Sequence, residues 1–90
     1  SNYPNTPPRR IVIKCTELQR RYLEALPLHH SQKVEEQNEE WSLISFFLAP
    51  TNEFYRRILS HREHMEIVSP PEVRAEFANI LDIMLQPYYE

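Results

Sequence analysis

Four short segments of the chain have residue patterns that are typical of β-strands. Residues 10–15 (RIVIKC) are rich in β-branched side chains and are expected to form a buried strand. Residues 33–37 are polar apart from one valine, as in a strand at the edge of a sheet. Residues 41–48 (WSLISFFL) form the most apolar segment and place large side chains on both faces, which predicts a central strand. Residues 65–69 form the last expected strand, because two prolines follow them.

Three other segments repeat apolar residues at helical spacing. The first begins at Thr16, whose hydroxyl can cap a helix, and stops at Pro27. The second follows Pro50, with Thr51 or Asn52 as its cap, and the third begins at the second of the two prolines, a residue suited to a first helical turn. The helical repeats are Leu18, Tyr22 and Leu26, then Phe54, Ile58 and His61, then Val73, Phe77, Ile80, Leu81 and Met84.

The resulting order of elements is βαββαβ followed by one more helix. With right-handed crossovers, this order closes most simply into an α+β, ferredoxin-like sandwich whose first and third strands are central. Two helices cover one face of such a sheet. The other face is therefore expected to be covered by the last helix, by another domain or by another subunit.

Length and composition indicate a single small domain. The chain has 90 residues and one cysteine, so no disulfide can form within it, and a reducing, cytoplasmic setting is the simplest inference. No apolar run approaches the roughly 20 residues needed to cross a bilayer. The proline-bearing start suggests that residues 1–8 are a linker or a cleavage remnant and that residues 9–90 are the domain.

Charge is distributed unevenly along the chain. Residues 1–34 hold six cationic side chains against two acidic ones, residues 35–90 hold four against eleven, and the two parts together give the net charge of -3. The basic part suits a local anion site, whereas the acidic remainder argues against a wide nucleic-acid surface.

Residue types that carry chemistry are present, but without the spacing that catalysis or metal binding requires. The chain has no glycine, which excludes the glycine-rich loops that cradle phosphates. His61 and His64 lie three residues apart, yet no spacing typical of a zinc site accompanies them. Cys15 has no histidine near it in the sequence and is interpreted as a small buried side chain. We therefore expect no enzyme, no metal site and no cofactor.

Aromatic residues of the segment 41–48 raise the alternative of an RNA-binding module, since such modules stack bases on the aromatic side chains of their central strands. The third strand of those modules also carries a glycine and a basic residue, and WSLISFFL has neither. Trp41, Phe46 and Phe47 are therefore interpreted as core residues.

The segment 28–33 (LHHSQK) concentrates polar and titratable side chains between the first helix and an edge strand. It is either a surface loop, in which Ser31 and Gln32 satisfy the hydrogen bonds of a turn, or a loop that binds a ligand or docks a domain. Histidine and lysine can donate to an anion, which keeps the second interpretation open.

At this segment the chain resembles a known family. RRIVIK, YLEALPLHHSQK, NEFYRRILSH and EIVSPPEVR are similar to sequences of the C-terminal extension (WCX) domain of bacterial WYL-domain transcriptional regulators. The resemblance covers nearly all of residues 9–89. Its loop pattern falls on His29, Ser31 and Gln32, and its helix positions fall on Phe54 and Leu59. Many relatives have a glycine where Arg62 stands, and a proline where His30 stands.

The resemblance implies a ferredoxin-like module that senses an effector and supports dimerisation. An upstream WYL domain and an upstream winged helix-turn-helix domain of the same chain would be its partners, and DNA would be bound only through the latter. A nucleotide or short nucleic acid is the expected effector, and no membrane is involved. The residues expected to contact the effector are Arg9, Arg10, His29, His30, Ser31, Gln32 and Lys33.

A free-standing small-molecule sensor of the ACT-like kind is the alternative, because it shares the βαββαβ order. Such sensors usually carry a glycine in the loop after the first strand, where this chain has Thr16 and Glu17. The regulatory module is therefore favoured.

Overall fold

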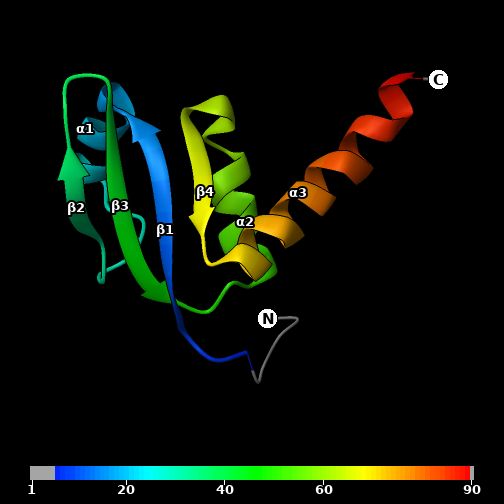
Figure 1. The fold of residues 1–90 in the computed structure, drawn as a ribbon, viewed down its shortest axis with the longest axis horizontal. Coiled ribbons are helices and arrows are strands. Elements are labelled where there is room, and N and C mark those ends of the chain that lie inside the picture. Colours follow the sequence, from blue (N-terminus) through cyan, green and yellow to red (C-terminus); the bar gives the residue numbers. More distant parts are fainter. Residues whose placement is uncertain (1–5, 90) are drawn as a thin grey trace.

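One antiparallel four-stranded sheet organises residues 6–89, the part of the chain that the computed structural model describes (Figure 1). Its strand order is β2-β3-β1-β4. The strands are β1 (Arg9–Thr16), β2 (Lys33–Gln37), β3 (Trp41–Leu48) and β4 (Met65–Ser69). The helices are α1 (Glu17–Ala25), α2 (Asn52–Leu59) and α3 (Pro71–Leu85), with short 3-10 helices η1 (Arg62–His64) and η2 (Gln86–Tyr89). The fold is thus α+β and consistent with the ferredoxin-like fold with an added C-terminal helix; residues 1–5 of the expected linker lie outside the described residues.

Local capping chemistry sets the ends of these elements. The Thr16 Oγ1 accepts a hydrogen bond from the backbone N–H of Gln19 (3.1 Å), so Thr16 caps α1 as expected. Thr51 caps α2 in the same way, and Pro71 occupies the first turn of α3. In the hairpin between β2 and β3, the Asn38 Oδ1 accepts hydrogen bonds from the backbone N–H groups of Glu40 and Trp41. The observed ends of β2, β3 and β4 are the ones predicted from the sequence, so these boundaries are confirmed.

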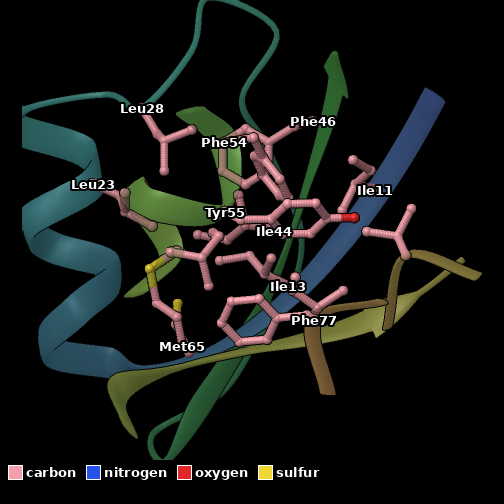
Figure 2. Packing of buried hydrophobic residues seen from close by; sticks show 14 residues of the cluster. Ile11, Ile13, Leu23, Leu28, Ile44, Phe46, Phe54, Tyr55, Met65 and Phe77 are labelled. Carbon is pink, nitrogen blue, oxygen red and sulfur yellow. The ribbon is translucent and has the colours of Figure 1, made fainter. Parts of the chain in front are cut away.

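The core lies between the sheet and two helices that cover the same sheet face, α1 and α2. Alternate residues of the central strands point into it, such as Ile11 and Ile13 from β1 and Ile44 and Phe46 from β3, all of them at most 1% exposed. Figure 2 shows Leu23 of α1, Met65 of β4 and Phe77 of α3 around these side chains. Side chains of the sheet and of all three α-helices thus form one hydrophobic core.

The apolar face expected for α1 is not the face that packs. Leu18, Tyr22 and Leu26 are 63%, 62% and 80% exposed, whereas Gln19 and Leu23 are buried. The packed face is displaced because Gln19 is satisfied inside the protein, where its side-chain nitrogen lies 3.1 Å from the Nδ1 of His61. An apolar ridge of α1 is consequently left at the surface.

The second face of the sheet, here called the open face, is not covered by α3. Because residues paired across β1 and β3 point to the same side, this face carries the buried Val12, the half-buried Leu43 and the exposed Phe47. Phe46 points into the core at 1% exposure, but Phe47 is 58% exposed on the open face. Trp41 lies on the same face and is only partly buried, so the assignment of the three aromatic residues to the core was right for Phe46 alone. Alternation along a strand sends neighbouring residues to opposite faces.

The last helix packs through Val73 and Phe77 and, less completely, through Ile80, which is partly buried against the core. Val73 and Phe77 are buried, and the ring of Phe77 stacks on that of Tyr55 in α2, with centroids 5.9 Å apart. Beyond this contact, α3 projects away from the sheet toward the C-terminus (Figure 1). We call residues 80–89 the arm. Its exposed large side chains are Leu81, Ile83, Met84, Leu85, Tyr88 and Tyr89.

A left-handed residue joins α2 to β4. Arg62, with φ of 59°, is the one non-glycine residue with positive φ in the described part of the chain. Glycine adopts this conformation without the steric cost of a Cβ atom. Arg62 is therefore held in a conformation that is unfavourable for a residue with a Cβ atom.

Candidate functional site

The loop between α1 and β2, residues 28–33, is held in place by its own side chains. The Gln32 Oε1 accepts a hydrogen bond from the backbone N–H of Leu28 (3.0 Å), and its Nε2 donates to the carbonyl oxygen of Leu23 (2.8 Å). The Ser31 Oγ accepts a hydrogen bond from the backbone N–H of Phe47 (2.8 Å). Ser31 and Gln32 therefore fix the loop to α1 and β3, as the surface-loop interpretation expects.

His29 is positioned by the same loop. Its Nδ1 accepts a hydrogen bond from the backbone N–H of Ser31 (3.2 Å) and lies 2.7 Å from the Ser31 Oγ. Because Nδ1 acts as an acceptor, the proton of the neutral ring lies on Nε2. Burial lowers the pKa of His29, and the nearby His30 and Arg57 lower it further. His29 is thus a neutral donor at neutral pH.

A cavity of about 240 Å³ opens beside His29, between the loop, the end of β3 and the start of α2. Arg57 and Glu53 of α2 supply its charged groups, and Thr51 adds a hydroxyl. The sequence did not reveal these α2 residues as site candidates. The signal that could have found them is the β2–β3 hairpin, which brings the loop before β2 next to the segment that follows β3.

Arg9, Arg10 and Lys33, the cationic residues predicted to contact the effector, lie at the same end of the sheet, but none of them lines this cavity. Arg9 forms an ion pair with Glu72 of α3 (3.2 Å), and Arg10 forms one with Glu35 of β2 (3.3 Å). Lys33 is paired in register with Ser45, next to the Glu35 carboxylate that accepts a hydrogen bond from the Ser45 hydroxyl (2.6 Å).

The structure therefore separates the expected site residues into two groups. His29 lines the cavity, and the exposed ring of His30 lies against it at a tilt of 33°, with ring centroids 4.1 Å apart. Arg10 belongs with Lys33 to the rim of the open face. A ligand that contacted both groups would have to extend around the end of β3.

The open face combines apolar and cationic side chains. The Nζ of Lys14 lies 5.1 Å from the centroid of the Trp41 ring, a cation–π contact, and Phe47 is exposed at the other end of the same strand. Phe47 on this face and the large side chains of the arm are apolar groups that the domain's own fold does not bury.

Metal-binding and nucleophilic chemistry find little support in residues 6–89. No group of three or more His, Cys, Asp or Glu side chains in this range could hold a metal ion. Burial, with a further contribution from the Glu17 carboxylate, raises the pKa of the Cys15 thiol to about 11. Since the thiolate is the reactive form, Cys15 is a poor nucleophile at neutral pH. Within the same range, no helix combines the length and the apolar character that membrane crossing requires.

Histidine protonation should make the fold less stable as the pH falls. The pKa values of His29 and His61 are lowered in the folded state, mainly by burial. The unfolded chain therefore binds these protons first, and the stability present above about pH 6.5 is lost as the pH drops toward the folded pKa values. We expect the thermal unfolding midpoint, followed by circular dichroism, to fall between about pH 7 and pH 5. A His29→Gln, His61→Gln double variant should lose less over this range, and an equal loss would contradict the assignment.

Strand order, two helices on one face and a projecting last helix define a ferredoxin-like α+β domain. A sequence model of the WCX domain matches residues 7–85, which is most of the chain. The chain therefore belongs to the WCX domain family, and it is a regulatory module of the kind found in WYL-type regulators. No curated protein matches the chain.

Proposed function

We propose that this domain is a non-catalytic effector-sensing and assembly module of a bacterial, cytoplasmic transcriptional regulator. In this role it relays ligand binding through an upstream WYL domain to an upstream winged helix-turn-helix domain. One observation carries the proposal: large apolar side chains of the arm, and Phe47 on the open face, stay exposed in this fold. Contiguous apolar surface of this kind marks contacts with other domains or subunits.

Assembly is supported by the composition of the arm. Residues 80–85 read ILDIML, so the helix is apolar almost all round, and Leu81, Ile83, Met84 and Leu85 are between 44% and 62% exposed. A helix that is apolar on every side is normally buried. We expect a second copy of the chain to bury the arm in a homodimer.

A role in sensing is supported by the hydrogen-bond donors that gather at the end of the sheet where the loop 28–33 lies. The neutral His29 and Arg57 line the cavity, and Arg10 and Lys33 lie on the adjoining rim of the open face. These groups can donate to the phosphates of a nucleotide or a short nucleic acid. An effector held here would lie between this domain and the WYL domain.

The ACT-like alternative has less support. Sensors of that kind usually carry a glycine in a loop after the first strand, whereas here β1 ends at Thr16 and α1 begins at Glu17. Thr16 uses its side chain to cap the helix. No loop separates the two elements.

Effector binding by the intact regulator tests the proposal. A fluorescein-labelled single-stranded oligonucleotide, followed by fluorescence anisotropy, is expected to bind the His29→Ala, Lys33→Ala variant at least about tenfold more weakly than the unmodified regulator, a difference of about 1.4 kcal/mol. The matched control is Lys14→Ala, which removes a cation next to Trp41, at the β2–β3 hairpin end of the sheet and away from the loop 28–33. Equal binding by the double variant and the unmodified regulator would show that the site is elsewhere.

A further inference from the structure

A groove of about 310 Å³ lies between α1 and the segment that follows α2, and the proposed function makes no use of it. One wall is formed by Tyr22, Leu23 and Leu26 of α1. The other is formed by His61, Arg62 and His64, which follow α2. The volume is within the range of small-ligand pockets.

The α1 wall is apolar and accessible. Leu23 is 2% exposed and forms the floor, while Tyr22 and Leu26 are 62% and 80% exposed. This is the ridge of α1 that the core leaves at the surface. The apolar part of a ligand can pack against these side chains, which the helix holds in place.

The opposite wall is polar and carries positive charge. The buried side chain of Gln19 links it to α1 through the contact of 3.1 Å with the His61 Nδ1. Arg57 and His64 add to burial in lowering the pKa of His61, which indicates a positive potential at this wall. None of the described residues that line the groove is acidic. An anionic group is thus favoured at this end.

Arg62 places the strongest cation at the rim of the groove. Its φ of 59° is a conformation that glycine adopts more easily, so its position is not explained by backbone preference. Its Nε lies 3.3 Å from the Glu63 Oε1, but both side chains are largely exposed, and a pair of this kind contributes little to stability. A bound anion can replace Glu63 as the partner of the guanidinium group.

We infer that this groove binds a small amphipathic carboxylate. The hydrocarbon or aromatic body of the ligand lies against Tyr22, Leu23 and Leu26, and its carboxylate is held by Arg62 and His64. The groove is separate from the cavity beside His29, because the two share no lining residue. The domain would therefore respond to a second, chemically different ligand.

Octanoate serves as the probe. In a titration of the 90-residue chain followed by two-dimensional ¹H–¹⁵N NMR, we expect saturable shifts in the amides of α1 and of residues 60–64. Leu26→Asp should abolish these shifts. Leu18→Asp is the matched control, because Leu18 is also exposed on α1 but does not line the groove. Its octanoate affinity should be unchanged.

The role of the carboxylate is tested separately. Arg62→Gly should weaken octanoate binding about tenfold without lowering the thermal unfolding midpoint, since glycine suits this backbone conformation. Binding of 1-octanol should be weaker than that of octanoate and insensitive to Arg62→Gly. Shifts that do not saturate, binding that persists in Leu26→Asp, or equal affinity for octanol and octanoate would each overturn the inference. So would the absence of octanoate binding to the intact regulator, which would show that a neighbouring domain covers the groove.

Discussion

Phe46→Ala is expected to lower the free energy of unfolding by about 3–5 kcal/mol, whereas Phe47→Ala should change it by no more than about 0.5 kcal/mol. Phe46 is 1% exposed within the core, so its removal loses buried apolar contacts and leaves a cavity. Phe47 is 58% exposed on the open face and has few contacts to lose. Urea unfolding of the two variants measures the difference.

The two phenylalanines form a matched pair, because they are neighbours in one strand and the same atoms are deleted. Similar losses of stability in both variants would mean that the open face is packed in the isolated domain. A small loss in Phe46→Ala would contradict the direction in which β3 presents its side chains.

Substitution in the arm is expected to abolish self-association. Leu81→Glu with Met84→Glu should weaken a dimer of the isolated domain at least about a hundredfold, because it places two charges on apolar surface that the partner buries. Both side chains are roughly half exposed in the single chain, 46% and 52% respectively, so the fold itself should tolerate the change. Multi-angle light scattering after size exclusion reports the mass at each concentration.

The control adds the same charges to the same helix without removing large apolar side chains. Ala78→Glu with Asn79→Glu changes two exposed residues and should leave the dimer nearly intact. If both double variants dissociate equally, net charge rather than the arm drives the effect. If the unmodified domain is monomeric at every concentration, the arm does not join two copies.

Much of the fold could be predicted from the sequence, because the signals that set it are local. Turn residues and prolines bound β2, β3 and β4, and the hydroxyls of Thr16 and Thr51 cap α1 and α2. The polarity of β2 against that of β3 indicated which strand lies at the edge. These features depend on neighbours in sequence and need no knowledge of the tertiary structure.

The packed face of α1 could not be predicted in this way. Apolar spacing favours the face of Leu18 and Leu26, but Gln19 is buried instead, satisfied by a histidine 42 residues away. A hydrogen bond over that separation leaves no local pattern. The groove between α1 and η1 follows from this displacement, and so it was also missed.

The candidate site was predicted in part. The loop 28–33 does lie beside a cavity, but Ser31 and Gln32 use their side chains to satisfy the backbone, and Arg57 enters the cavity from α2. The residue types alone do not show whether a polar side chain hydrogen-bonds the protein backbone or is available to bind a ligand. The tertiary structure makes that distinction through the partners of each atom.

Hydroxyl-radical footprinting of the intact regulator and of the isolated domain, diluted to monomers, tests most directly whether this domain is a module completed by its neighbours. Oxidation rates of Phe47 on the open face and of Met84 in the arm should fall at least several-fold in the intact regulator. Met65 is 5% exposed in the single domain and should react slowly in both samples. Equal oxidation of Phe47 and Met84 in the two samples would contradict the proposed role in assembly.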